Sequence, residues 1–188
     1  LKRLSGEWRT EEPEEPRARA LLLYRRGLAR SYSDPSSDRA REMLADAIAV
    51  DPSVAQYYLA HGFVLEQQYR DEKQKGRQAV GLLENALANY EQALGLADRE
   101  LDPPFYADVL LNLGNAAKEL DQHARATGFY ERRTRQQVGF DDERTEFLFH
   151  FNYGISSFRA AYPERASKEF SRAAEMLRDD LETMGPVK

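Results

Sequence analysis

The sequence predicts an all-α protein, a solenoid built from four helix–turn–helix repeats. Three observations lead to this prediction. From residue 17 onward apolar residues recur at intervals of three and four, the period of a helix, and no strand-like alternation interrupts them. Proline with Asp or Ser divides this stretch into short segments. Small and large apolar residues then recur at matched places in successive segments.

The segments are separated where proline or a helix-capping residue stands. Proline has no backbone N–H to donate, and Asp or Ser accepts the first amides of the helix that follows. Such signals occur at Ser33-Asp34-Pro35, Asp51-Pro52, Asp102-Pro103-Pro104, Gly139 to Asp142 and Tyr162-Pro163. Together with the helical periodicity between them, these signals predict eight helices, over residues 18–33, 37–50, 53–75, 77–99, 103–121, 123–138, 142–160 and 163–182.

Residues 1–16 differ in composition from the rest and are expected to form a flexible acidic leader. The stretch from Thr10 to Pro16 holds two prolines and four glutamates, with nothing to bury. The only tryptophan, Trp8, lies in this leader. It is either an anchor, for the array's own groove or for a partner's pocket, or a remnant of an upstream element. The array is placed over residues 17–182, with repeats at about 18–52, 53–102, 103–140 and 142–182 and a tail at 183–188.

Glycine, alanine and a large apolar residue recur in register. A glycine lies mid-way along the first helix of each pair, an alanine near the start of each second helix, and a large residue four positions after the alanine. These are Gly27, Gly62, Gly114 and Gly154; Ala40, Ala86, Ala126 and Ala166; and Leu44, Tyr90, Tyr130 and Phe170. We interpret the glycine and alanine as facing each other, which lets two helices approach closely, with the large residue filling the space under the next pair. Each pair keeps an uncovered face until a neighbour stacks on it, so the units must come in series.

This pattern resembles the tetratricopeptide repeat family, whose repeat runs Trp-x₂-Leu-Gly-x₂-Tyr, then Ala-x₃-Phe, then Pro. The resemblance covers residues 18–182 and implies a right-handed α-solenoid. The fullest match is the third unit, with Leu110, Leu113, Gly114, Ala117, Ala126 and Tyr130. No unit carries the tryptophan, Arg133 replaces a small residue, and the spacing exceeds the usual ~34 residues. Residues 67–78 of the second unit are strongly polar, so we expect both helices of that pair to extend into a projecting hairpin.

In the resembled family, the first helices of successive pairs line a concave groove that holds a peptide or a partner's helix. Carried over position by position, the resemblance implies a groove in four sets of residues, one from each first helix. The sets are Leu21, Tyr24 and Leu28; Gln56, Leu59, Phe63 and Glu66; Asp108, Leu111, Asn115 and Lys118; and Leu148, Phe151, Ile155 and Phe158.

The last of these sets forms one apolar stripe, because its members are spaced by three, four and three residues along a helix. Tyr153 and Gly154 fall on another face, which we expect to meet the preceding pair. The stripe is either a trough for an amphipathic partner segment or a packing surface. As a packing surface it would contact the last helix, a lost C-terminal helix or a second copy of the chain. Such arrays usually end in a polar capping helix, and none follows residue 182.

The middle of the predicted groove is polar. Asn115 and Lys118 lie three apart on one helix, which suits hydrogen bonds to an extended peptide and its carboxylate, and equally an ordinary solvated face. The family's clamp for C-terminal carboxylates needs Lys and Asn on the first helix of the array. This sequence has Tyr24 and Leu28 at those places, so recognition of that type is not expected.

Composition excludes several classes of function. The chain has no cysteine, which excludes disulfides, thiolate metal sites and cysteine nucleophiles, and a net charge of -5 gives no reason to propose nucleic-acid binding. The longest apolar run near the start, Ala20 to Tyr24, falls far short of the ~20 residues that span a bilayer, and no signal peptide is visible. A cytoplasmic and a periplasmic location both stay open. The three histidines, His61, His123 and His150, lack the clustered ligands that zinc requires. With neither a phosphate-binding glycine loop nor a nucleophile elbow, we expect no cofactor, no metal and no enzyme activity.

These observations favour a scaffold that binds a partner peptide or helix in a bacterial assembly, envelope or regulatory complex. A fold does not by itself determine function, so alternatives are kept. One is a substrate chaperone of a secretion or assembly system, a class that is small, acidic and often homo-oligomeric. Another is a regulatory domain of a larger protein, since the chain begins with Leu rather than Met. An enzyme comes last and would require a buried cluster of perturbed carboxylates in one pocket.

Overall fold

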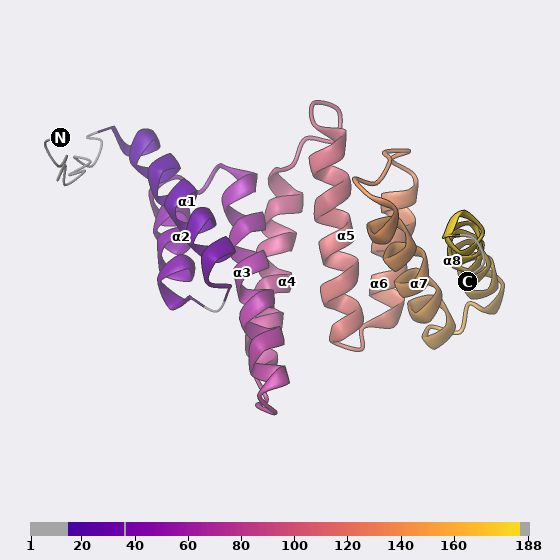
Figure 1. The fold of residues 1–188 in the computed structure, drawn as a ribbon. Coiled ribbons are helices and arrows are strands. Elements are labelled where there is room, and N and C mark those ends of the chain that lie inside the picture. Colours follow the sequence, from indigo (N-terminus) through magenta and orange to yellow (C-terminus); the bar gives the residue numbers. More distant parts are fainter. Residues whose placement is uncertain (1–14, 36, 185–188) are drawn as a thin grey trace, which may run out of the picture.

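The computed structural model describes residues 15–35 and 37–184, with side chains described up to Arg178. Within these ranges the regular structure consists of eight helices and no strand. The helices are α1 (Pro16–Ser33), α2 (Asp38–Val50), α3 (Ala55–Gln74), α4 (Val80–Leu96), α5 (Pro103–Glu119), α6 (His123–Thr134), α7 (Glu143–Arg159) and α8 (Pro163–Met184). They form four consecutive pairs that stack along one array, which confirms the predicted all-α solenoid (Figure 1).

Helix starts agree with the sequence prediction to within three residues and helix ends to within four. Side-chain caps account for two of the starts: Asp102 Oδ1 accepts from the Phe105 amide at 3.1 Å, and Asp142 Oδ1 accepts from the Thr145 amide at 2.8 Å. The largest difference is at α6, which ends at Thr134 rather than at residue 138. Gln137 has a φ of 55°, in the left-handed region that a helix does not continue through. The predicted leader up to residue 14, with Trp8, and residues 185–188 of the predicted tail lie outside the described residues.

The second pair is longer than its neighbours, as its polar sequence predicted. α3 has 20 residues and α4 has 17, against 13 in α2 and 12 in α6. The end of this hairpin projects beyond the rest of the array (Figure 1). Its charges are paired locally: Lys75 contacts Asp71 and lies 3.5 Å from Glu72, while Arg77 lies 3.0 Å from Glu72. The projecting tip is therefore a solvated, self-neutralised segment.

Within each pair, the large residue of the second helix lies against the glycine of the first. A Cβ on Gly62 would lie 2.6 Å from the Tyr90 ring, and one on Gly154 would lie 2.6 Å from the Phe170 ring. The sequence interpretation placed the alanine opposite the glycine. The carbonyl oxygen of Ala86 lies 3.1 Å from the position that a Cβ on Gly62 would take. The absence of a side chain on glycine therefore leaves room for an aromatic or leucine side chain, which brings the two helices together.

The core runs through the contacts between pairs. In the second to fourth pairs, Tyr90, Tyr130 and Phe149 are fully buried members of one continuous cluster. A smaller cluster around Leu44 and Val64 joins the first pair to the second. The large residues thus also meet the following pair, which is the second role that the sequence assigned to them.

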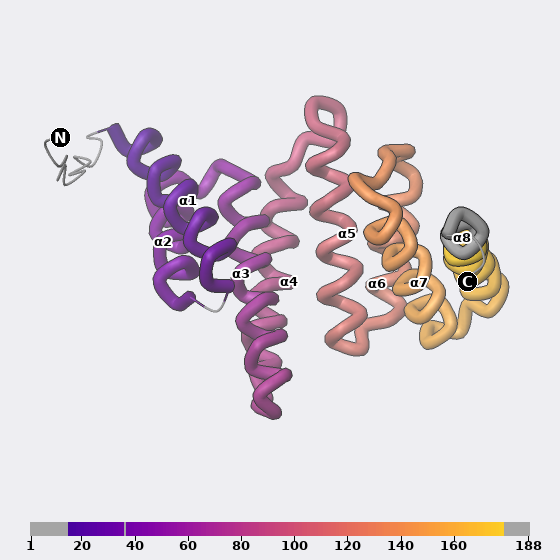
Figure 2. The backbone as a smooth tube through the Cα atoms, viewed as in Figure 1, coloured from indigo at the N-terminus to yellow at the C-terminus, as the bar shows by residue number. Residues whose placement is uncertain are grey.

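First helices form the inner layer of the array. α1 contacts α3 directly and α5 contacts α7, whereas no comparable contact joins α2, α4, α6 and α8 to one another within the described chain. First helices that approach each other while second helices splay apart produce a curved stack, with the first helices on the concave side. The backbone trace in Figure 2 shows α1 and α8 at opposite ends of this array.

Candidate functional site

A hollow of about 260 Å³ opens on the concave side among α3, α5 and α7. Each residue that lines it belongs to a first helix, which places it where the sequence predicted a groove. We call it the central hollow. Its lining residues are Arg70, Leu111, Asn115, Lys118, Glu119, Thr145, Leu148, Phe149 and Asn152. Of the residues assigned to the groove from the sequence, the structure brings Leu111, Asn115, Lys118 and Leu148 together here.

A chain of hydrogen bonds crosses the central hollow from α6 to α7. The Tyr130 hydroxyl donates to Asn115 Oδ1 at 2.8 Å, and the Asn152 amide donates to the same oxygen at 3.3 Å. Lys118 Nζ donates to Asn152 Oδ1 at 3.0 Å. Asn115 and Lys118 therefore have a structural role that their spacing did not reveal, because both are bound to residues distant in the sequence.

An ion-pair network continues this chain to α3. Lys118 Nζ lies 3.1 Å from Glu119 Oε1, and Lys73 Nζ lies 3.0 Å from Glu119 Oε2. Burial would raise the pKa of the Glu119 carboxyl, but the two lysines outweigh burial and lower it. Lys73, in turn, has a raised pKa because it donates to Glu119. Sequence reasoning missed Lys73, Glu119 and Asn152, since no local motif marks an ion pair between separate helices.

Toward the N-terminal end, predicted groove residues take part in packing between pairs. The Tyr24 ring lies 5.0 Å from that of Tyr57, and Leu28 packs against the cluster around Leu44. Leu59 packs against the main core. The remaining groove residues of this half and of the start of α5 do not line the central hollow: Leu21, Gln56 and Asp108 are exposed, Phe63 is half-buried and Glu66 is buried.

At the C-terminal end, the predicted apolar stripe is largely exposed. Leu148, Phe151 and Phe158 are 43%, 42% and 67% exposed, and Ile155 is half-buried. Leu148 faces the central hollow, whereas the Phe151 ring lies 6.1 Å from that of Phe170 on α8. The stripe thus divides between the groove and the end of the array.

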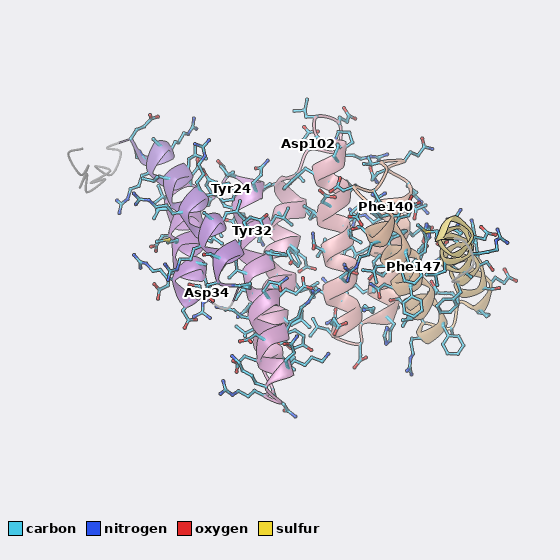
Figure 3. The ribbon with its side chains drawn as sticks, viewed as in Figure 1. Tyr24, Tyr32, Asp34, Asp102, Phe140 and Phe147 are labelled. Carbon is cyan, nitrogen blue, oxygen red and sulfur yellow. The ribbon has the colours of Figure 1, made fainter. Side chains whose placement is uncertain are left out.

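Phe147, which Figure 3 labels, extends this apolar surface. Its ring stacks on that of Phe151 at 5.9 Å with 12° between the planes. The face opposite the stripe was predicted to meet the preceding pair. Tyr153 does so, with its ring 5.5 Å from that of Tyr130. Gly154 does not, because it faces Phe170 of its own pair.

Arg133, which interrupts the series of small residues, holds the loop between α6 and α7. Its side chain is buried and donates to the carbonyl oxygens of Val138 at 2.6 Å and Gly139 at 2.8 Å. The guanidinium also lies 3.8 Å from the centre of the Phe140 ring, a cation–π contact. The sequence showed that Arg133 replaces a small residue of the repeat, but it did not reveal that Arg133 holds the loop.

A larger hollow, of about 450 Å³, lies outside the groove, between the α6–α7 loop and α8. It is lined by groups of both charges, including Arg133, His150 and Arg172. Within it, His150 Nδ1 lies 2.7 Å from Glu169 Oε2. Among the described residues, no three His, Asp or Glu side chains come together in a way that could hold a metal ion. None of the helices in this part of the chain has the length and apolar character to cross a membrane.

Solved structures of tetratricopeptide type are similar to this chain. The crystal structure of MamA matches with a TM-score of 0.61 and 19% identity, over 87% of this chain and 81% of MamA, and a second MamA structure gives 0.60. BtubC (BKLC) from P. vanneervenii matches with a TM-score of 0.63 and 19% identity, over 94% of this chain and 69% of its own. No family model matches the sequence, and no curated protein is similar to it. The fold is a tetratricopeptide-type α-solenoid, as the sequence resemblance implied.

Proposed function

We propose that this protein is an interaction scaffold that binds a peptide or helix of a partner protein on the concave face of α3, α5 and α7. The observation that carries the proposal is the mixed lining of the central hollow. Leu111 and Leu148 offer apolar contact, while Asn115, Lys118 and Asn152 offer oriented polar groups. A concave surface with apolar walls and a few fixed polar groups is the usual form of a recognition site.

The distribution of polarity suggests how a partner would lie. Apolar side chains continue from the hollow along α7, where Leu148 is 43% exposed and Ile155 is half-buried. On the α3 side the hollow is bordered by Arg70 and by the Lys73–Glu119 ion pair. An amphipathic helix with its apolar side toward α7 and its polar side toward α3 fits both borders. Similarity in fold to MamA and BtubC agrees with this proposal but does not identify the partner.

Two leucines with equal exposure provide a matched test. Leu148 lines the central hollow and Leu96 ends α4, outside it, and each is 43% exposed. The immobilised wild-type chain, Leu148→Asp and Leu96→Asp are compared by affinity capture and quantitative mass spectrometry. Partners that bind in the groove are expected to be lost by Leu148→Asp and kept by Leu96→Asp, because a carboxylate cannot be desolvated against an apolar partner surface.

A captured partner is then purified and titrated against the three proteins. We expect at least a roughly tenfold weaker affinity for Leu148→Asp, which corresponds to about 1.4 kcal/mol. If both variants bind every partner as the wild type does, recognition does not use the central hollow and the proposal is wrong.

A further inference from the structure

Positions that each pair presents to the next can be compared by counting from the mid-helix glycine. Seven residues before it stands an alanine in the first three pairs: Ala20 and Ala107 are 0% exposed and Ala55 is 7% exposed. Ala20 shares a cluster with Tyr57 of α3, so the following pair covers it. In the last pair this position is Phe147, which is only half-buried. The last pair therefore carries a large apolar residue where its predecessors carry a covered small one.

Two further positions show the same change. The large residue of the second helix is 0% exposed in the first three pairs, as Leu44, Tyr90 and Tyr130, but Phe170 is only half-buried. Four residues after the glycine, Ser31 and Glu66 are buried and Lys118 is half-buried, whereas Phe158 is 67% exposed. We call the resulting surface the end face, and it consists of Phe147, Phe151, Phe158 and Phe170.

The covered interfaces along the array show what fits such a surface. In α5 and α7, the incoming helix has buried residues at positions five, four and one before its glycine and two and three after it. In α5 these are Val109, Leu110, Leu113, Ala116 and Ala117, and in α7 they are Phe149, His150, Tyr153, Ser156 and Ser157. If the first of these residues is called i, large residues lie at i, i+1 and i+4, and small residues lie at i+7 and i+8. The contact is direct, since the rings of Phe149 and Tyr153 each lie 5.5 Å from that of Tyr130.

Other parts of this chain do not supply that pattern. In α1 the corresponding residues are Leu22, Leu23, Arg26, Ala29 and Arg30. An arginine at two of the five places makes α1 suited to begin a stack, and unsuited to continue one by docking head to tail on another copy. Residues 1–14 contain no two adjacent apolar residues.

We propose that the end face docks an amphipathic helix of a partner protein, in the place that the first helix of a further pair would take. The helix carries large residues at i, i+1 and i+4 and small residues at i+7 and i+8, as α5 and α7 do, because the end face continues the interfaces that these two helices form. Apolar area is then buried on both sides, which is the driving force within the array itself. This surface is separate from the central hollow, so one molecule can hold two partner segments.

A helix of the protein itself serves as the probe. A fluorescent peptide of residues 101–120 holds α5 with its cap Asp102 and carries the required pattern. In anisotropy titrations we expect saturable binding to the wild-type chain. Phe151→Ser and Phe158→Ser are each expected to weaken it at least about tenfold, the ratio that the loss of one buried aromatic contact produces. Tyr32→Ser removes an aromatic residue that is 74% exposed on α1, at the other end of the array, and should bind as the wild type does (Figure 3).

Three results would overturn the proposal. The first is the absence of saturable binding, or equal binding of a peptide that carries Leu110→Asp and Leu113→Asp. The second is loss of binding in Leu148→Asp with retention in Phe158→Ser, which would place the peptide in the central hollow. The third is a wild-type dimer in sedimentation velocity that Phe158→Ser converts to a monomer, which would make a second copy the occupant. Circular dichroism melts establish that each variant is folded.

Discussion

The hydroxyl of Tyr90 donates a 2.9 Å hydrogen bond to Oε2 of Glu66, and both side chains are buried. The other carboxylate oxygen accepts from Arg70 at 2.5 Å. This contact joins α4 to α3 one turn beyond Gly62, where the Tyr90 ring packs against the first helix. A buried carboxylate is tolerated here because each of its oxygens has a donor. Burial, and secondarily the charge of Glu66, raise the pKa of Tyr90 well above its ordinary value, so the phenol stays protonated as a donor.

Removing the Tyr90 hydroxyl should destabilise the second helix pair. Tyr90→Phe keeps the ring but leaves one oxygen of the buried Glu66 carboxylate without its donor, so we expect the free energy of unfolding to fall by about 1.5–3 kcal/mol. Tyr130→Phe is the matched control, because its hydroxyl donates to the neutral amide of Asn115. That substitution should cost only about 0.5–1.5 kcal/mol. Urea denaturation measures both, and a larger loss in Tyr130→Phe would show that the charge on Glu66 does not matter.

Substitution by alanine should change the stability of the protein in opposite directions at two glycines on neighbouring helices. A Cβ on Gly114 would overlap the Tyr130 ring, whereas one on Gly128 meets nothing within 4 Å. Gly114→Ala is expected to destabilise by about 1–3 kcal/mol through overpacking. Gly128→Ala lies on the exposed side of α6 and should stabilise by about 0.5–1 kcal/mol through helix propensity. Stabilisation by both substitutions would contradict the close ring–glycine packing.

The loop after α6 should depend on Arg133. Arg133→Ala removes two hydrogen bonds to the Val138 and Gly139 carbonyls and the contact with Phe140, so we expect a loss of about 2–3 kcal/mol. Arg133→Lys should recover little, since an ammonium group does not reproduce the planar fork that reaches both carbonyls. Hydrogen exchange at residues 135–142 should accelerate in both variants. Unchanged exchange there would mean that the loop is held by other contacts.

Stability should depend on pH through His61. Burial lowers the pKa of His61 below its usual value of 6.5, and the neutral ring donates from Nδ1 to Asn89 Oδ1 at 3.0 Å. Below pH 6.5 the unfolded chain takes up a proton that the folded protein resists. The free energy of unfolding therefore falls as the pH drops below 6.5 and levels off once the folded histidine is protonated.

The replacement His61→Gln keeps a donor for Asn89 and removes the titration. Urea midpoints measured near pH 7.5 and near pH 5 should therefore differ less in this variant than in the wild type. The difference between the two proteins isolates His61 from the other two histidines. Parallel pH profiles would show that His61 does not titrate differently on folding.

Local patterns in the sequence were sufficient for the helices and their pairing. Proline with an Asp cap sets the start of α5, and the recurring glycines identify the pairs, because both effects act within a few residues. Contacts between residues far apart in sequence had no such signal. The bond from Lys118 to Asn152 joins residues 34 apart, and the one from Lys73 to Glu119 joins residues 46 apart.

Arg133 shows the intermediate case, in which the sequence reveals a departure from the repeat but not its structural purpose. The groove was placed on the first helices from resemblance alone. Its division into a central hollow and an end face depends on how Phe151 packs against Phe170, a contact between two helices that spacing along α7 does not specify.

The linked contacts from Lys73 through Glu119 and Lys118 to Asn152 act as a brace across three successive inner helices. For the partner segment that we propose, the docking surface is already assembled, so little ordering entropy is lost on binding. The brace is partly ionic and partly exposed to water, and dissolved salt screens such contacts. Under the proposed function, we therefore expect ionic strength to alter the curvature of the inner surface, and with it the affinity for a partner segment that carries no charge.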